Sequence, residues 1–267
     1  MRSSVTNLND ASLMPWRLQN FSEEIKSFRG ILIALTIVGL WAINLAFLFS
    51  LDLSQVQVVW VILEIAVQTF LYTGLFITAH DAMHGSLFPR NHQINHLMGA
   101  AIVLLYAFFP YRKLLKNHWA HHLHPASEAD PDFHNGRHQN IVAWYGSFIT
   151  RYCSWPQIIG LSSLFHLLRL TSLVSEENLI LFWLVPSLLS SLQLFYFGIF
   201  LPHREPAGGY TNSHRARSNS LPPFWSFITC YHFGYHEEHH ESPYIPWWQL
   251  PTIRKQRIPV QTQLPVQ

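Results

Sequence analysis

The sequence predicts an all-α, integral-membrane helical bundle of about four transmembrane helices, with a histidine-rich cap on the cytoplasmic side. Two observations predict this class. The 267 residues are 49% hydrophobic and only 12% charged, which is about half the charged fraction of an average soluble domain. The chain also contains 17 histidines against 15 carboxylates, an excess of the side chain that most often binds metal ions.

The first two helices are expected at residues 31–51 and 56–79, on either side of a short turn at 52–55. Each run is long enough to cross the hydrocarbon core, because about twenty residues at 1.5 Å rise each suffice. Glu64 interrupts the second run, and we interpret it as hydrogen-bonding within the bundle.

Three further apolar runs follow. Residues 97–111 form a run too short to cross, which is expected to return to its own side of the membrane. Residues 158–174 are a weaker crossing and residues 179–201 a clear one, in which Pro186 predicts a kink. Together with the first two runs, these segments predict four crossings.

The basic residues predict the orientation. Of 17 Lys and Arg, 16 lie before residue 30, between residues 80 and 151, or after residue 201, and the predicted loops at 52–55 and 175–178 contain none. The positive-inside rule therefore predicts that both termini and all histidine-rich segments are cytoplasmic.

The chain reads as a single domain spanning residues 1–267, without internal repeats. Residues 1–29 form a polar segment that lacks the layout of a cleaved signal peptide. Residues 252–267 are expected to form a C-terminal tail. We expect no nucleic-acid partner.

Three histidine boxes lie next to the predicted helices. His80 and His84 are four residues apart, which places both imidazoles on one helix face. Two HxxHH boxes repeat this spacing, and each is expected to converge on one side of its helix. Their histidines are His118, His121, His122, His236, His239 and His240.

These eight imidazoles predict a metal centre, because crowded histidines would repel one another if protonated, whereas metal ions bind them in the neutral form. A zinc site with three protein ligands would leave most of the boxes without a role. Two irons with four or five nitrogens each fit the number. His203, just after the last span, is the candidate ninth ligand. His166 is expected toward the opposite face and is not a candidate.

Candidate catalytic residues next to the ligands are Asp81, Asp130 and His134. A metal-bound imidazole commonly donates its second N–H to a carboxylate, which fixes the ring and raises its basicity. His134 follows the acidic stretch and is expected to orient ligands or line the substrate entrance. Glu237 and His232 are further candidates, and an exposed position on the helix surface stays open for Asp81 and Glu237.

The three boxes together resemble those of the membrane fatty-acid desaturase and hydroxylase superfamily. Longer strings around them resemble the β-carotene ketolases of bacteria and algae. These strings are His80 to Gly85, His118 to His122 continued by Asp130 to His134, Leu201 to Arg204, and Phe233 to Pro251.

The resemblance implies that the C4 methylene of a β-ionone ring is converted to a ketone by two successive O2-dependent hydroxylations, giving echinenone and canthaxanthin from β-carotene. It also implies two iron ions, dioxygen as cosubstrate and a ferredoxin-type electron donor. The carotenoid would enter from the membrane lipid.

Two alternatives share this chemistry, a carotenoid 3-hydroxylase and a lipid desaturase. A different class is a histidine-rich membrane metal transporter. Transporters place polar ligands near the bilayer midplane and often consist of repeated halves. Here the boxes lie outside the predicted spans and no repeat is found, so an oxygenase is favoured.

Overall fold

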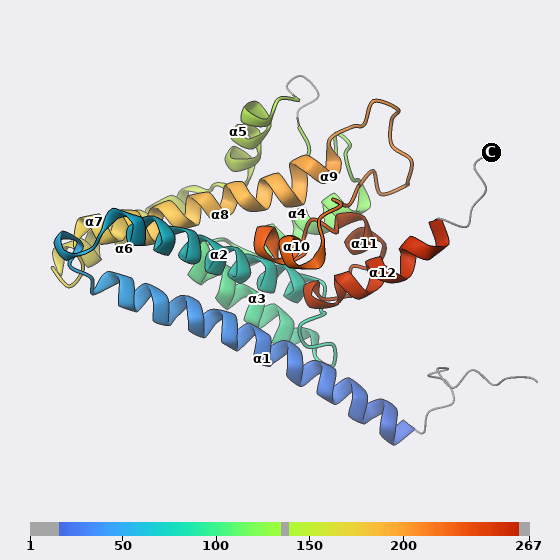
Figure 1. Cartoon of the computed structure of the whole chain (residues 1–267), viewed down its shortest axis with the longest axis horizontal. Helices are drawn as coiled ribbons and strands as arrows, with labels where there is room; N and C mark the ends of the chain where they lie inside the picture. Colours follow the sequence, from blue (N-terminus) through green and yellow to red (C-terminus); the bar gives the residue numbers. More distant parts are fainter. Residues whose placement is uncertain (1–15, 135–138, 262–267) are drawn as a thin grey trace, which may run out of the picture.

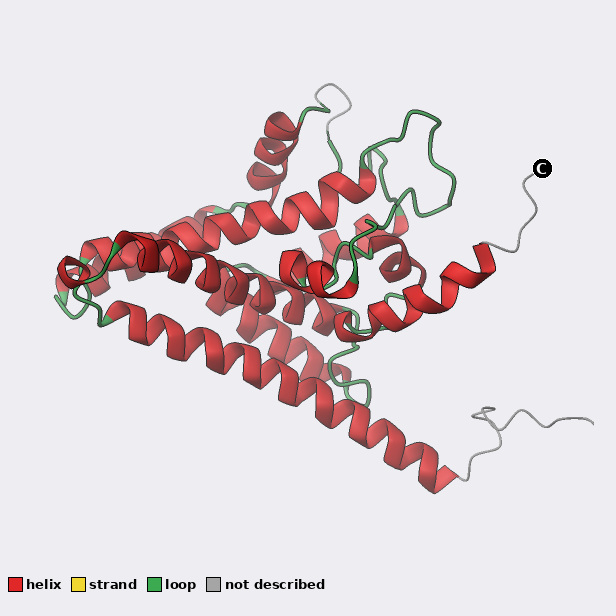
Figure 2. Ribbon diagram, viewed as in Figure 1, coloured by secondary structure: helices red, strands yellow, loops and turns green. Residues whose placement is uncertain are grey.

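The computed structural model describes residues 16–134 and 139–261, and every regular element in these residues is helical (Figures 1 and 2). The predicted all-α class is confirmed. The outermost parts of the expected N-terminal segment and C-terminal tail, residues 1–15 and 262–267, lie outside the described residues.

The first two helices are α1 (Trp16–Phe49) and α2 (Val58–Met83), joined through the 3-10 turn η2 (Leu53–Gln55). The apolar part of α1, Phe28–Phe49, has a mean hydropathy of 2.4, and α2 has one of 1.7, so both can cross a membrane. Both predicted spans are confirmed. Because α2 runs past residue 79, the first histidine box forms its last turn.

The next pair, α3 (His92–Ala107) and α4 (Tyr111–Leu123), is bent by 103°. Phe108, at the end of α3, has a φ of 55°, and Pro110 precedes α4, so the helix cannot continue because the residue before a proline disfavours the α conformation. α3 packs along α2, and α4 brings the second box back to the end of α2. The return of residues 97–111 to their own side of the membrane stays a prediction.

α5 (Ile141–Tyr152) and α6 (Trp155–Leu170) correct the expected crossing at 158–174. α6 has 16 residues and is therefore about 24 Å long, shorter than a full crossing. The sequence overstated its length because the apolar run continues through a turn, where Ser172 has a φ of 51°. Among the described residues, three helices qualify as spans, or four if the bent α3–α4 pair counts as one.

The last span, Glu176–His203, is one continuous helical rod. Its expected kink at Pro186 takes the form of a π-helical turn before the proline, and a second such turn precedes Pro202. A proline lacks an N–H and clashes with the carbonyl four residues earlier, which the wider π turn relieves. The rod consists of α7 (Glu176–Asn178), η3 (Leu179–Leu184), α8 (Val185–Phe195), η4 (Tyr196–Phe200) and α9 (Leu201–His203).

Four short elements gather where α2 and α9 end (Figure 1). They are α10 (Pro223–Cys230), α11 (His236–Glu241), η5 (Trp247–Gln249) and α12 (Leu250–Gln261). α11 carries the third histidine box and contacts α12. Residues 252–261 of the expected C-terminal tail belong to α12.

Candidate metal centre

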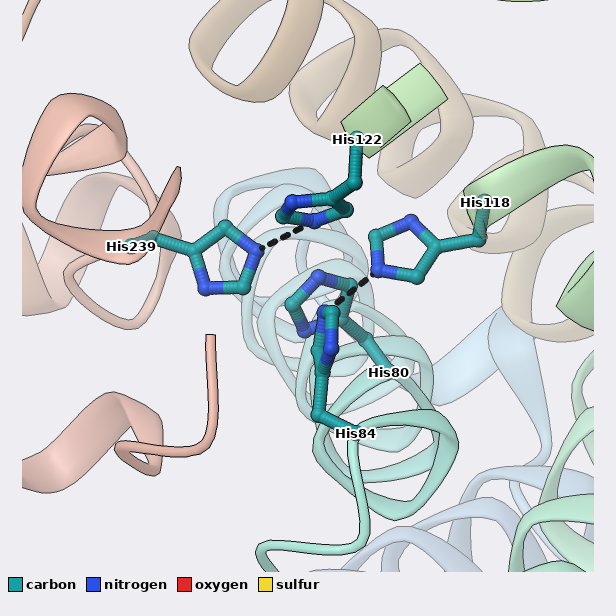
Figure 3. Close-up of side chains that lie close together, drawn as sticks. All are labelled: His80, His84, His118, His122 and His239. Atoms are coloured by element: carbon teal, nitrogen blue, oxygen red, sulfur yellow. Dashed lines mark hydrogen bonds between the residues drawn. The ribbon is translucent and has the colours of Figure 1, made fainter. Parts of the chain in front are cut away.

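All nine predicted ligands lie together at this end of the bundle, in two groups. In each group the ligand nitrogens lie within 4.8 Å of one another. The first histidine group, drawn in Figure 3, is His80, His84, His118, His122 and His239. The second histidine group is His121, His203, His236 and His240.

Each HxxHH box divides its imidazoles between the two groups, which corrects the expectation that each box faces one side. His118 and His122 are four residues apart and share the first group, while His121 points to the second group. The third box mirrors this division, because His239 alone belongs to the first group. Neighbouring residues of an α-helix point about 100° apart, so the adjacent histidines of a box face different groups.

The ring nitrogens approach one another as ligands of a common ion do. The Nε2 atom of His236 lies 2.9 Å from Nε2 of His203 and 3.1 Å from Nε2 of His240. An ion about 2.1 Å from each imidazole nitrogen, with ligands at right angles, places neighbouring nitrogens about 3 Å apart. The residues present therefore fit a metal ion, because several lone pairs converge on one point.

Burial keeps the imidazoles of the third box in the form that binds metal. His236, His239 and His240 are buried. Burial, followed by the neighbouring imidazoles, lowers the pKa of each of the three well below its ordinary value. Because metal ions bind neutral imidazole, no proton has to be displaced from these rings at neutral pH.

Asp130 orients one ligand of the second group. Both of its carboxylate oxygens lie 3.0 Å from Nδ1 of His121, which leaves Nε2 of His121 to face His240 at 3.1 Å. Burial opposes the charged form, but the His121 imidazole holds the pKa of Asp130 below its ordinary value. The same carboxylate accepts the backbone N–H groups of Ala126 and Asp132 at 2.9 and 2.8 Å. This is the geometry expected of a carboxylate behind a metal ligand.

A backbone carbonyl, that of Arg215, orients His203 in the same way. Nδ1 of His203 donates to the Arg215 carbonyl oxygen at 2.9 Å. A carbonyl oxygen only accepts, so the proton is on Nδ1 and Nε2 is free to bind metal.

Asp81 lies next to a predicted ligand, whereas His134 lies outside both histidine groups. Asp81 is buried, and its Oδ2 accepts the backbone N–H of Trp247 at 3.0 Å. Its Oδ1 is 3.5 Å from Nδ1 of His80, so Asp81 lies beside this imidazole and also connects α2 to the segment after the third box. His134 packs against the rings of Phe133 and Trp144, with centroids 3.9 and 4.9 Å away, and belongs to neither group.

His166 and His232, which were also considered from the sequence, lie outside both groups as well. His166 is exposed on α6, as expected for a histidine that is not a ligand. His232 stacks on Tyr235 at 5.7 Å between centroids.

Two arginines that sequence reasoning did not select bind α12 to the third box. Arg254 forms an ion pair with Glu238 at 2.9 Å, and Arg257 contacts Glu237 at 3.2 Å and Glu241 at 2.8 Å. The spacing of three residues between Arg254 and Arg257 is visible in the sequence, and it places both side chains on one face of a helix. The candidate Glu237 is thus part of an ion-pair network rather than a hydrogen-bond partner of an imidazole.

Asp132 and Tyr152 are two further residues of the site that were not predicted from the sequence. The Tyr152 hydroxyl donates to Oδ1 of Asp132, and Oδ2 of Asp132 lies 3.8 Å from Nδ1 of His121. Burial raises the pKa of Asp132 to about 6. No sequence spacing links these residues, because a loop and the length of α5 separate them.

A cavity of about 860 Å³, including its open mouth, borders both histidine groups. It touches His80 and His118 of the first group and His121 and His236 of the second. Cys153, which is exposed, lies on the wall of the cavity. The remaining wall is mostly apolar or aromatic and includes Phe76, Met83, Phe109, Leu114, Phe148, Leu194, Ile199 and Phe233.

Comparison with known proteins locates this site within a family. The family profile described as fatty acid desaturase matches residues 54–173 and 149–263. Beta-carotene 4-ketolase 3 of Haematococcus lacustris is 39% identical over 255 residues, covering 85% of this chain and 79% of that protein. The beta-carotene ketolase of Paracoccus sp. strain PC1 is 40% identical over 216 residues, covering 80% of this chain and 88% of that protein.

A zeaxanthin 4-ketolase of Chlamydomonas reinhardtii is 38% identical over 239 residues, covering 85% of this chain and 53% of that protein. The profile matches include all nine histidines of the two groups. The chain therefore belongs to the fatty acid desaturase family and, within it, to the β-carotene ketolases.

Proposed function

We propose that this protein is a membrane carotenoid 4-ketolase that converts the C4 methylene of a β-ionone ring to a ketone. Two hydroxylations at the same carbon give a geminal diol, which loses water to leave the ketone. The observation that carries this proposal is the largely apolar cavity that reaches both histidine groups in a chain of the β-carotene ketolase family.

The nine histidines would hold two iron ions, five imidazoles at one and four at the other. Bound there, the irons would supply activation of dioxygen with electrons from a ferredoxin-type donor. Imidazole suits iron, and four or five nitrogens leave a coordination position open. Asp130 and the Arg215 carbonyl orient two of these ligands. Asp81 and His134 remain proposed supporting residues, the first by holding the Trp247 segment.

The protein's own contribution is to place one ring carbon and exclude water. The aromatic and aliphatic wall accepts an apolar ring, and His80, His118, His121 and His236 form its inner end. A dry wall protects a reactive oxidant from side reactions. The exposed Cys153 marks where the cavity approaches the surface, which gives a lipid-dissolved polyene a route to the irons.

The site is proposed to face the cytoplasm, with both termini on the same side. The described basic residues near it include Arg90, Arg204, Arg217 and Lys255, all exposed, as the positive-inside rule requires. Within this arrangement, residues 1–267 act as one domain.

The test is expression in a β-carotene-producing bacterium, with pigment chromatography and iron analysis of the purified protein. Echinenone and canthaxanthin with about two irons per chain are expected. A His121→Ala variant, inserted at the same level, should make no ketone.

Other products would contradict the proposal in identifiable ways. A hydroxyl at C3 would indicate a carotenoid 3-hydroxylase, and new double bonds in lipids a desaturase. Metal uptake without pigment change would indicate a transporter. An active preparation with stoichiometric zinc and no iron would refute the di-iron centre.

A further inference from the structure

Asp132 stands out among the polar side chains on the cavity wall. It is 7% exposed and borders the same open space as His121 and His236. Besides Tyr152, two hydroxyl-bearing residues line the wall, and both already donate hydrogen bonds. Tyr106 donates to Ser190 at 3.2 Å, and Ser191 donates to the Leu188 carbonyl at 2.7 Å. Asp132, in contrast, lies next to a histidine of the second group, with its Oδ2 3.8 Å from Nδ1 of His121.

Among the described residues, the partners of its carboxylate leave hydrogen-bonding capacity unused. Oδ1 accepts from the Tyr152 hydroxyl. The N–H at Nδ1 of His121 donates its hydrogen bond to Asp130, which is 3.0 Å away, whereas Oδ2 of Asp132 is 3.8 Å from Nδ1. A carboxylate accepts about four hydrogen bonds, and a buried polar group with unused capacity is costly unless a partner arrives. A ligand hydroxyl in the cavity would be such a partner.

Carotenoid chemistry supplies a hydroxyl at that position. The reacting carbon C4 is bonded directly to C3, so a hydroxyl on C3 lies two bonds from the atom presented to the irons. Asp132 lies on the side of His121 away from the metal-binding Nε2, and both border the cavity. A ring with C4 toward the histidines can thus direct its C3 oxygen to Asp132.

We propose that Asp132 recognises the C3 hydroxyl of ring-hydroxylated carotenoids, so that the cavity binds zeaxanthin in preference to β-carotene. This inference rests on the proposed ketolase function. Tyr152 acts as a positioning residue, because its hydroxyl holds the Asp132 carboxylate at the wall. A hydrogen bond to a charged group contributes enough for about a ten- to hundredfold preference.

The experiment measures equilibrium binding of zeaxanthin and of β-carotene to the purified iron-loaded protein in nanodiscs under nitrogen, where no turnover occurs. Wild type should bind zeaxanthin at least about tenfold more tightly. Asp132→Ala should lower that ratio by about tenfold. Asp132→Asn, which keeps the shape and a neutral acceptor, should lower it severalfold, since charged hydrogen bonds are roughly twice as strong as neutral ones.

Two further variants serve as controls. Ser191→Ala removes a hydroxyl from another part of the wall and should leave the ratio unchanged. Tyr152→Phe should keep at least half of the logarithm of the wild-type affinity ratio, because the carboxylate remains. If Tyr152→Phe abolished the preference while Asp132→Asn kept it, the tyrosine would be the recognising group and the inference would be wrong.

Iron content is measured in every variant. If Asp132→Ala fails to bind iron, Asp132→Asn decides alone, and an unchanged ratio in that variant overturns the inference. Equal losses for both carotenoids would indicate a purely structural role and would also overturn it. A wild-type protein that oxidises no carotenoid in air would instead refute the proposed function, so the two failures are distinguishable.

Discussion

Replacing Asp130 with alanine should weaken iron binding without removing a ligand. The carboxylate contacts Nδ1 of His121 with both oxygens at 3.0 Å, and its loss leaves this ring free to rotate or change tautomer. Loss of such an outer hydrogen bond lowers metal affinity by about 10- to 100-fold, which corresponds to about 1.4–2.8 kcal/mol. Asp130→Asn should fall between wild type and alanine, because the amide oxygen still accepts a hydrogen bond.

The assay is the iron retained per chain after dialysis against graded concentrations of a chelator. Glu128→Ala is the matched control, because Glu128 is exposed in the same loop. Asp130 also holds the loop through the N–H groups of Ala126 and Asp132, so thermal unfolding of the metal-free variants separates lost folding from lost orientation. If Asp130→Ala retained as much iron as Glu128→Ala at every chelator concentration, the orienting role would be refuted.

Three further predictions concern other parts of the chain. His203→Ala should lower bound iron and abolish ketone formation while the protein still inserts, whereas His166→Ala should keep both; full iron in the first variant would remove His203 from the ligands. Arg257→Ala breaks partly exposed ion pairs to the α11 glutamates, each contributing about 0.2–1 kcal/mol, and should lower the Tm by about 2–4 °C in a thermal melt; no change would show that the Arg257 ion pairs do not stabilise the third box. Reporters fused near Asp52 and Glu176 should lie outside and one at the C-terminus inside; a C-terminal reporter on the outside would contradict the cytoplasmic site.

The roles of Asp81, His134 and Asp132 depend on how distant segments fold back, and sequence separation does not encode this. Asp81 is adjacent to a ligand in sequence, yet its hydrogen bond goes to Trp247. His134 follows the acidic stretch closely but packs on Trp144. Asp132, in contrast, meets Tyr152 at the cavity because α5 folds back over the loop.

Local chemistry was readable from the sequence because it depends on short-range periodicity. Apolar runs of bilayer length predicted α1, α2 and the last span. The spacing of four residues correctly predicted that His80 and His84, His118 and His122, and His236 and His240 converge, whereas the same expectation for histidines three residues apart was wrong. All nine predicted ligands lie in the two groups. The 100° between adjacent residues of α4 makes His121 and His122 point in different directions. Only the tertiary structure decided which group each one joins, because the other histidines come from α2, α9 and α11.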